Sequence, residues 1–269
     1  MNLESRIHEA SEEGRLSLGA AEDMAALFHI SLHDVERAAL DLGVWPCRYH
    51  RQSSLLTSRE QLILLDSTVV VAGCGGLGGY AAALLARLGI GRLILIDPDQ
   101  FEESNLNRQL FCTVETLGMN KAVAAADALS KINPAVSTEP VEYDLRQSEY
   151  MVAMTDAALD CLDNVPARRL LAGICRRHAI PLVHGAVSST FGQLGVDVSG
   201  SSIIDRLYPA RSSGSAVRDT NVLSFSVAAV AALQCSEVLK LLLHRPSLLQ
   251  DSYLFFDIDG LEFEYGLSA

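Results

Sequence analysis

A glycine-rich run that directly follows a short β-branched stretch most constrains how this chain can fold. Residues 68–72 read Thr-Val-Val-Val-Ala, which is typical of a buried strand, and residues 73–78 read Gly-Cys-Gly-Gly-Leu-Gly. Such glycines permit a tight turn and let backbone amides approach a phosphate at the start of a helix. With a helix expected over 80–88, the pattern predicts the first unit of a nucleotide-binding sheet.

The same alternation of short apolar runs and helical stretches continues along the chain. It predicts an α/β fold with a Rossmann-like, mainly parallel sheet and helices on both faces. Further strands are expected at 92–96, 157–161, 181–184, 193–198 and 253–258, and further helices at 121–131 and 224–243.

Residues 1–45 predict a small helical N-terminal extension ahead of the main domain at 46–269. An Ala-rich helix is expected over 20–28, and Ser31 with Asp34 predicts a capping-box start for a second helix that ends near Leu42. Two such helices raise DNA binding by a helix-turn-helix as a hypothesis. The second helix is acidic, which disfavours contact with phosphates, so packing or docking of a partner is the preferred interpretation.

The charge balance and the cysteine pattern exclude several classes of protein. With 21 Lys and Arg against 33 Asp and Glu, the net charge of -12 repels phosphate backbones and anionic lipids, so we expect neither nucleic-acid nor membrane binding. The apolar stretch at 227–243 is interrupted by polar residues, and the N-terminus lacks the order of a secretory signal. The six cysteines show no close pairing, which predicts a cytoplasmic protein without a disulfide framework.

Two cations and several amides follow the expected strand at 92–96. Asp97, at the end of that strand, is placed to accept hydrogen bonds from ribose hydroxyls. The glycine run and Asp97 alone would suggest NAD, or a turn that only packs a strand against a helix. Arg108 and Lys121 together favour a triphosphate, because they would neutralise its outer groups and the pyrophosphate that leaves. Around Arg108 the chain reads Ser104-Asn105-Leu106-Asn107-Arg108-Gln109.

A third expected strand ends in two carboxylates, Asp160 and Asp163, and Asn164 follows them. Carboxylates at this edge of a parallel sheet face the ligand crevice, and Mg²⁺ is usually held by one or two of them together with phosphate oxygens. We favour Asp163 as the metal ligand, because Asp160 falls inside the strand and would equally fit a buried, hydrogen-bonded group.

Taken in order, these residues resemble the MoeB/ThiF/HesA family of ubiquitin-activating-enzyme-like adenylyltransferases. The resemblance covers about residues 46–265 and rests on Arg48-Tyr49-His50-Arg51-Gln52, the glycine run, the segment from Ser104 to Gln109, Lys121 and Asp163-Asn164. It implies that ATP and Mg²⁺ convert the C-terminal glycine of a ubiquitin-like sulfur carrier protein, ending in Gly-Gly, into an acyl-adenylate with release of pyrophosphate. Biosynthesis of the molybdenum or tungsten cofactor and of thiamine fit equally well.

The resemblance also implies a role for each matching residue. Arg51, Arg108, Lys121 and Asp163 would carry catalysis, with Asp163 holding Mg²⁺. Arg51 would reach the triphosphate of the neighbouring subunit, which implies a homodimer. Nucleotide contacts are expected from Gly73, Gly75, Gly76, Asp97, Asp99, Ser104, Asn105, Leu106, Asn107, Arg108, Gln109, Lys121, Asp163 and Asn164.

The chain departs from many members of that family in its cysteines. It contains no Cys-x-x-Cys pair, and no cysteine lies between Cys175 and Cys235, where relatives carry a catalytic one. We therefore expect no zinc and a separate protein as the sulfur donor, with Cys175 and Cys235 buried. The segment from Ser199 to Asn221 would guide the tail of the carrier, or form a solvated loop.

Three rival functions fit the sequence less well. ATP-dependent dehydration of a modified tRNA base, by a related family, is the alternative function, and the acidic charge counts against it. The Asn-Leu-x-Arg-Gln segment disfavours a nicotinamide-dependent dehydrogenase. A non-catalytic scaffold would be expected to lose nucleotide-site residues, and this chain retains them.

Overall fold

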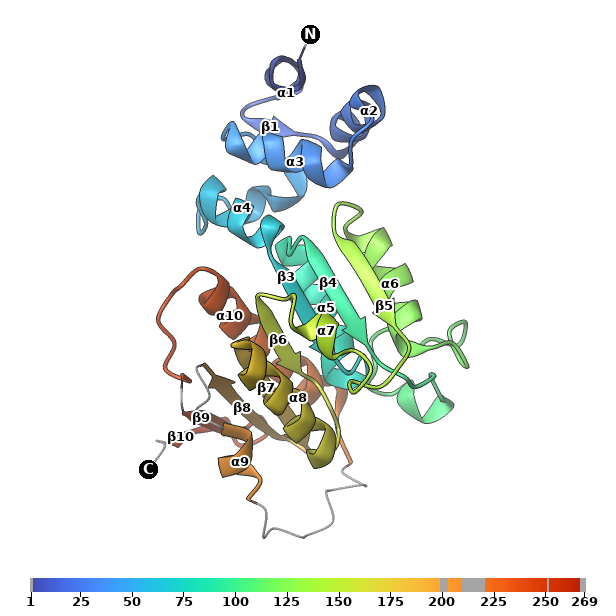
Figure 1. The fold of residues 1–269 in the computed structure, drawn as a ribbon, viewed down its shortest axis with the longest axis vertical. Helices are drawn as coiled ribbons and strands as arrows, with labels where there is room; N and C mark the ends of the chain where they lie inside the picture. Colours follow the sequence, from blue (N-terminus) through green and yellow to red (C-terminus); the bar gives the residue numbers. More distant parts are fainter. Residues whose placement is uncertain (1, 199–202, 210–220, 251, 267–269) are drawn as a thin grey trace.

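An eight-stranded sheet forms the centre of the structure, a computed structural model that describes residues 2–198, 203–209, 221–250 and 252–266 (Figure 1). The strand order is β10-β9-β8-β7-β6-β3-β4-β5. Strands β7, β6, β3, β4 and β5 run parallel, and β8, β9 and β10 extend the sheet antiparallel. The bounds are β3 Thr68–Ala72, β4 Arg92–Ile96, β5 Ser137–Val141, β6 Ala157–Asp160, β7 Leu182–Ser188, β8 Phe191–Asp197, β9 Tyr253–Asp257 and β10 Glu262–Gly266.

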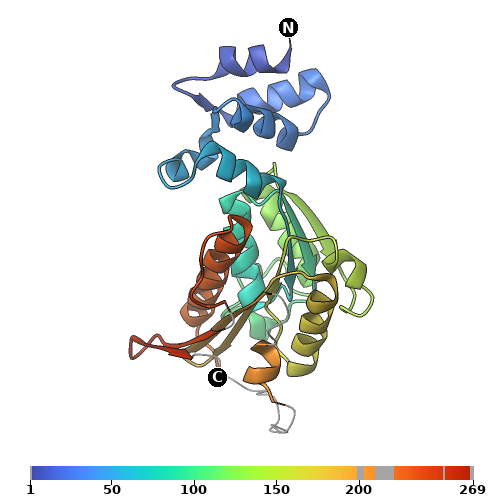
Figure 2. The same cartoon turned by 60° about the vertical axis from the view of Figure 1, so that its left-hand side comes forward.

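Helices cover both faces of this sheet (Figure 2). In β3, Val69 and Val71 belong to the core under α5, α6 and α10, whereas Val70 and Ala72 belong to the core under α7, α8 and α9. Successive side chains of a strand point to opposite faces, so a strand that is apolar throughout requires cover on both. The predicted fold class is confirmed. The helices are α5 Gly76–Leu88, α6 Lys121–Ile132, α7 Glu149–Val152, α8 Val165–His178, α9 Ile203–Leu207 and α10 Ser224–Leu242.

Six α-helices and strands in the described part of the main domain were not predicted from the sequence: α4 (Ser58–Asp66), β5, α7, α8, α9 and β10. Strand β5 reads Ser-Thr-Glu-Pro-Val and buries only Val141, so it has neither an apolar run nor a clean alternation. It is the outermost strand of the sheet, where a proline is tolerated because one side of the strand has no neighbouring strand to bond.

Among the described residues, one helix, α10, is long and apolar enough to cross a membrane by length and composition alone. It packs on α5 and on strands β7 and β8. Gln234 of this helix is fully buried and donates hydrogen bonds to Asp160 O and Val183 O, at 3.0 and 3.3 Å. Helix α10 is therefore a core helix of the sheet.

Residues 2–46 form a small unit with its own apolar cluster, here called the N-terminal module. It contains α1 (Leu3–Ala10), α2 (Leu18–Phe28) and α3 (Leu32–Asp41), and β1 (Arg15–Leu16) pairs parallel with β2 (Trp45–Pro46). The predicted capping box is present, since Ser31 Oγ accepts from Asp34 N–H and Asp34 accepts from Ser31 N–H. Helix α1 was not predicted. The cluster consists of Ile7, Leu16, Ala21, Met24, Val35, Ala39 and Val44.

Helix α3 joins the N-terminal module to the rest of the chain through one face. His33, Glu36 and Arg37 stand three and four residues apart, so they share that face. His33 Nε2 lies 3.0 Å from Leu65 O, and Arg37 forms two hydrogen bonds with Asp66, at 2.9 and 3.1 Å. Glu36 is 1% exposed and pairs with Arg48.

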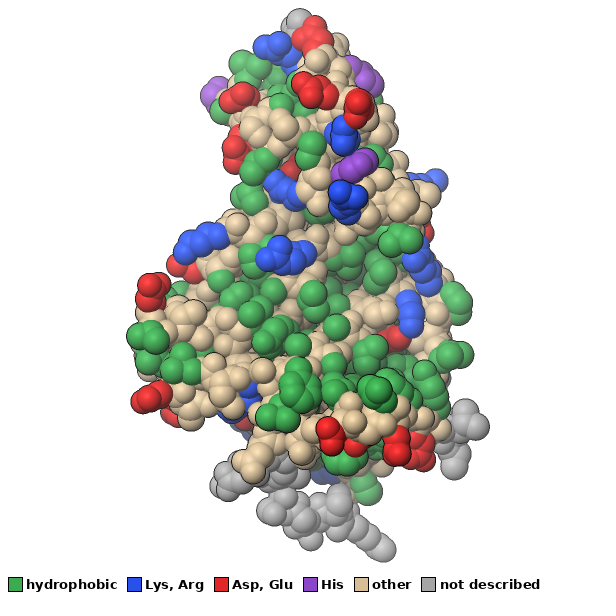
Figure 3. All heavy atoms as spheres, turned by 180° about the vertical axis from the view of Figure 1, so that it is seen from behind, with side chains coloured by type: hydrophobic (Ala, Val, Ile, Leu, Met, Phe, Trp, Pro, Cys, Tyr) green, Lys and Arg blue, Asp and Glu red, His purple; other side chains and the backbone are tan. Residues whose placement is uncertain are grey.

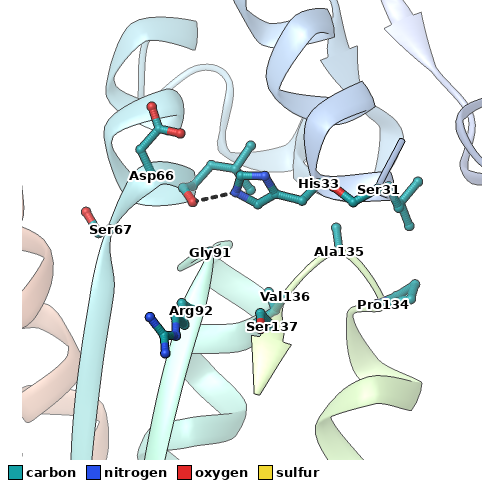
Figure 4. Close-up of a pocket in the computed structure, with 12 residues that line it drawn as sticks. Ser31, His33, Asp66, Ser67, Gly91, Arg92, Pro134, Ala135, Val136 and Ser137 are labelled. Carbon is teal, nitrogen blue, oxygen red and sulfur yellow. Dashed lines mark hydrogen bonds between the residues drawn. The ribbon is translucent and has the colours of Figure 1, made fainter. Parts of the chain in front are cut away.

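A cavity of about 440 Å³ opens beside this joint (Figure 4). Ser31 and His33 line it from α3, Gly91 and Arg92 line it at the start of β4, and residues 134–137 close it at the start of β5. It therefore lies at the amino-terminal edge of the parallel strands, opposite to the edge where β3 runs into the glycine run.

Glu36 predicts that stability depends on pH. Burial raises the pKa of Glu36 to about 7, although the charges of Arg48 and His33 act to lower it. The folded state therefore binds this proton more tightly than the unfolded chain, and the free energy of unfolding falls as the pH rises from about 4.5 through 7.

We expect wild type to lose up to roughly 3 kcal/mol more stability than Glu36→Gln between pH 5 and pH 8, because Gln does not titrate. Urea unfolding of both proteins at the two pH values measures this difference. Equal losses in the two proteins would contradict the raised pKa.

Candidate functional site

The glycine run lies where three parallel strands end side by side. Gly73 follows β3, Asp97 follows β4 and Cys161 follows β6. Gly73 N–H donates to Ile96 O at 2.8 Å, and Cys161 N–H donates to Ala72 O at 3.0 Å, so hydrogen bonds join the three ends. The chain leaves β3 for β4 on one side and later returns to β6 on the other, which is where α/β sheets open their ligand crevice.

Two glycines of the run are required because backbone approaches them closely. Gly73 has a φ of +91°, and a Cβ there would lie 2.7 Å from Cys161 O. A Cβ on Gly78, in the first turn of α5, would lie 1.7 Å from Gly73 O. The run therefore carries bare backbone to the N-terminus of α5, where free amides and the helix dipole favour an anion.

Asp97 braces the glycine run. It is 6% exposed, and its Oδ2 accepts from Cys74 N–H at 2.7 Å while its Oδ1 accepts from Asp99 N–H at 2.9 Å. Burial raises the pKa of Asp97, although these hydrogen bonds and the Lys121 charge act to lower it. Each carboxylate oxygen has a second lone pair, so the ribose contact predicted for Asp97 is compatible with this bracing.

Lys121 and Asn120 tie the end of β4 to the start of α6. Lys121 is 9% exposed, and its Nζ lies 3.1 Å from Asp99 Oδ2. Asn120 caps α6 by accepting from two amides of its first turn, and its Nδ2 donates to Asp97 O and Asp99 O at 2.9 and 3.1 Å. Asn120 had no predicted role, although an Asn before a helical run is a capping signal.

The segment 104–109 packs against the glycine run, with its two ends in different surroundings. Ser104, Leu106 and Asn107 are exposed. Arg108 is half-buried, and its Nη1 donates to Ser104 O and to Asn107 Oδ1, both at 2.9 Å. Asn105 is buried and accepts from Glu102 N–H, so it shapes the turn.

Gln109 presents a buried acceptor beside the glycine run. A Cβ on Gly75 would lie 3.4 Å from Gln109 Nε2, and a Cβ on Gly76 would lie 3.9 Å from Arg108 O. Within the described residues, Gln109 Oε1 is buried without a hydrogen-bond partner. Buried polar atoms are normally paired, so a ligand that donates a hydrogen bond here would satisfy an existing acceptor.

The two aspartates after β6 have opposite environments. Asp163 is exposed and accepts from Asn164 Nδ2 at 3.0 Å, while Asn164 Oδ1 caps α8. Asp160 is fully buried, with Oδ2 at 2.7 Å from His184 Nδ1. Asp160 is thus a buried, hydrogen-bonded group, which was its alternative predicted role, and Asp163 remains the predicted metal ligand.

A buried polar network that was not predicted from the sequence surrounds Asp160. Arg168 donates from Nη2 to Leu162 O at 2.6 Å and from Nη1 to Tyr208 Oη at 2.9 Å, close to His184. Burial acts to raise the pKa of Asp160, but the charge of Arg168 and the hydrogen bond to His184 hold it below its usual value. Burial lowers the pKa of His184. These residues are far apart in sequence, so no local pattern could reveal them.

The cysteines lie mostly in the core. Cys175 and Cys235 are buried as predicted, and burial raises the pKa of each thiol to about 12. Cys74 in the glycine run is also buried, and burial raises its pKa. In the part of the chain that the structure describes, no three His, Cys, Asp or Glu side chains are grouped to hold a metal ion. Most of the predicted tail guide at 199–221 lies outside the described residues.

Arg51 lies at the opposite edge of the sheet from the other predicted site residues. It is exposed on the 3-10 helix η1 (Cys47–Gln52). Gln52 Nε2 donates to Leu88 O at 3.1 Å, and Tyr49 Oη accepts from Asn133 Nδ2 at 2.7 Å. Leu88 and Asn133 precede the starts of β4 and β5, whereas the glycine run follows the end of β3. One chain therefore does not bring Arg51 together with the glycine run.

Residues 49–265, which include the glycine run and the whole sheet except the last residue of β10, match the ThiF family. The chain belongs to the ThiF family. It is 39% identical over 206 residues to the SAMP-activating enzyme E1 of Haloferax volcanii, across 75% of this chain and 76% of that protein. It is 40% identical over 153 residues to the molybdopterin-synthase adenylyltransferase of Escherichia coli, across 55% and 61%.

Two further comparisons give the share of each protein that this ThiF-family chain matches. It is 36% identical over 224 residues to the adenylyltransferase and sulfurtransferase MOCS3 of Danio rerio, covering 80% of this chain but only 49% of that protein. The structure of Escherichia coli MccB with ATP superimposes with a TM-score of 0.72 at 21% identity, over 91% of this chain and 78% of that one, which shows the same fold. The predicted family and the predicted adenylyltransferase class are confirmed.

The close approach at Gly78 predicts a contrast with the adjacent Gly79. Gly78→Ala would place a methyl group 1.7 Å from Gly73 O, so we expect a loss of about 2 kcal/mol or more in the free energy of unfolding. A Cβ on Gly79 would lie no closer than 3.5 Å to Phe111, and Ala favours a helix, so Gly79→Ala should change stability by less than about 1 kcal/mol. Urea unfolding measures both, and equal effects would refute this description of the run.

Proposed function

We propose that this ThiF-family chain uses ATP to adenylylate the C-terminal glycine of a ubiquitin-like sulfur carrier protein, with release of pyrophosphate. The observation that carries the proposal is that the glycine run at the start of α5, the buried Lys121 and the exposed Asp163 share one edge of the sheet. The likeness to the SAMP-activating enzyme E1 and to the molybdopterin-synthase adenylyltransferase supports the same class of reaction.

The reaction fits a site built from amides and fixed charges. A carboxylate oxygen of the carrier's terminal glycine forms a bond to the α-phosphorus of ATP, and the bond from that phosphorus to the oxygen shared with the β-phosphorus breaks. Pyrophosphate leaves with the bonding electron pair, and AMP stays on the carrier. A carboxylate is ionised at neutral pH, so no proton moves and no general base is required. Catalysis then comes from positioning and from charge neutralisation.

The residues at the edge divide these tasks by their chemistry. The amides of Gly75 and Gly76 at the N-terminus of α5 would hold phosphate oxygens, and Asp97 would accept from the ribose. Arg108 and Lys121 would offset the charge of the outer phosphates and of the leaving pyrophosphate. Gln109 Oε1, the buried acceptor without a partner in the described chain, would be satisfied by a donor of the nucleotide.

The residues present also fit Mg²⁺. Asp163 offers an exposed carboxylate at the strand end, and Mg²⁺ in such sites takes one or two carboxylates together with substrate phosphates and water. When bound, Mg²⁺ supplies charge neutralisation for the triphosphate. Asp163 would hold it, and Asn164 fixes the Asp163 carboxylate by donating to its Oδ1 at 3.0 Å.

Arg51 is proposed to act in the second subunit of a homodimer. The glycine run of the same chain lies at the opposite ends of the parallel strands. Arg51 would therefore reach a triphosphate only in another chain. Hydrophobic side chains gather on the face that α5 and α10 cover (Figure 3), and Leu84 and Phe225 of these helices are 38% and 52% exposed. This face is the proposed contact between the two copies.

The cysteines support a cytoplasmic enzyme that leaves sulfur transfer to another protein. All six are free thiols, and Cys47 alone among them is exposed. The chain has no cysteine between Cys175 and Cys235, a range that includes the predicted tail guide at 199–221. We therefore propose a separate sulfur donor protein and no structural zinc. The resemblance to the family suggests that the final product is the molybdenum or tungsten cofactor or thiamine.

Replacing Arg108 or Asp163 with Ala tests the site. Each variant should lower ATP–pyrophosphate exchange with a Gly-Gly carrier by about 100-fold or more, because each removes a charge that acts on the triphosphate. Both side chains are accessible and make only local hydrogen bonds, so unfolding in urea should be nearly unchanged. Asp127→Ala, at an exposed position on α6, is the matched control and should keep full exchange. Undiminished exchange in Arg108→Ala and Asp163→Ala would refute the assignment.

Mixing two inactive variants tests the proposed role of Arg51 across the dimer. Arg51→Ala and Asp163→Ala homodimers should each be inactive. A heterodimer has one site with an intact Asp163 and an Arg51 supplied by the other subunit, so it should recover up to about half of the wild-type exchange. Heterodimers that form but stay inactive would place Arg51 in its own subunit's site or outside catalysis.

A further inference from the structure

We infer that the N-terminal module positions Arg51 through a buried contact between Glu36 and Arg48. Glu36 lies on α3 of the module, and Arg48 stands three residues before Arg51 on the short helix η1. The inference rests on the proposed function, because it takes Arg51 to act on the triphosphate of the neighbouring subunit. It gives the extension at 2–46 a task in the reaction, and Glu36 and Arg48 are its positioning residues.

The contact is a three-way junction between the module, η1 and the end of α6. Arg48 Nη1 lies 3.2 Å from Glu36 Oε1 and also donates to Asn133 Oδ1. Asn133 is 1% exposed, and its Nδ2 donates to Tyr49 Oη at 2.7 Å and to Ala86 O at 2.8 Å. One arginine therefore joins the carboxylate of the module to a residue fixed in the main domain.

Helix η1 is held on both sides of Arg51. On the side of the main domain, Gln52 Nε2 donates to Gln61 Oε1 at 2.8 Å. On the side of the module, β1 pairs with β2, and Trp45 N–H donates to Gly14 O at 2.9 Å. The side chain of Arg51 is exposed, and it forms no hydrogen bond or ion pair with other described residues. The direction of Arg51 therefore follows from where its neighbours place the backbone of η1.

The burial of Glu36 indicates a positioning role more than a stabilising one. Removing a carboxylate from water is costly, and a buried ion pair seldom recovers more than that cost. What a buried pair provides is a fixed geometry, because both partners lose their hydrogen bonds if either moves. The exposed pair of Arg37 with Asp41, on the same helix at 3.1 Å, has no such requirement. The two pairs therefore allow a matched comparison.

The test places Glu36→Ala in one subunit of the mixed dimer at a time. In the heterodimer of Arg51→Ala and Asp163→Ala subunits, one site is intact. The Arg51→Ala subunit supplies the nucleotide-binding residues of that site, and the Asp163→Ala subunit supplies its Arg51. Glu36→Ala in the Asp163→Ala subunit, which supplies Arg51, should lower kcat for exchange by about tenfold or more with little change in the KM for ATP. The same change in the Arg51→Ala subunit should leave exchange unaltered.

This dependence on the subunit separates positioning from loss of stability. A module that Glu36→Ala merely destabilised would lower exchange equally from either subunit. Glu36→Gln, which keeps an oxygen acceptor for Arg48, should restore most of the lost kcat. Asp41→Ala should have no effect in either subunit. Equal losses from both placements of Glu36→Ala, or no loss from either, would overturn the inference.

The outcome also distinguishes this inference from the proposed function. Wild-type exchange that depends on the carrier keeps the proposed function whatever Glu36→Ala does. If Arg51→Ala and Asp163→Ala form heterodimers without recovering activity, the positioning of a trans-acting Arg51 is overturned, while adenylylation stands. Absence of exchange in wild type would overturn both.

Discussion

The nucleotide edge of the sheet depends on backbone packing that leaves no room for side chains. A Cβ on Gly73 would clash with Cys161 O, and a Cβ on Gly78 would clash with Gly73 O. This packing joins the ends of β3, β4 and β6, so the groups that follow each strand lie at one place: the amides of Gly75 and Gly76, Asp97 with Lys121, and Asp163. The affinity for an anion and the supply of opposing charge are both consequences of that join.

The opposite edge of the sheet holds a second set of fixed groups. Gln52, Tyr49 and Arg48 anchor η1 to the main domain and to the N-terminal module, and they leave Arg51 exposed. Because the two edges of a parallel sheet lie a full strand length apart, a reaction that needs both sets needs two chains. The face covered by α5 and α10, with its exposed apolar side chains, offers the surface on which two copies would meet.

The sequence predicts those parts of the molecule whose signals are local. The β-branched run before the glycines gave β3, and the capping box at Ser31 gave α3. Strand β5 was not predicted, because an outermost strand needs no apolar alternation and tolerates its proline. Asp160, Arg168 and His184 meet only after folding, so their network has no sequence signature. Asp97 was expected to face the ribose, but its bonds to the glycine run were not foreseen.

ATP–pyrophosphate exchange, measured with Mg²⁺ and a purified ubiquitin-like carrier ending in Gly-Gly, tests the central claim most directly. The comparison is with the same carrier lacking its terminal glycine. If the chain forms an acyl-adenylate on that glycine, exchange requires both the carrier and its last residue, because only its carboxylate is placed to attack the α-phosphorus. Exchange that proceeds equally well without the terminal glycine, or no exchange across a panel of such carriers from a protein that binds ATP, would contradict the account.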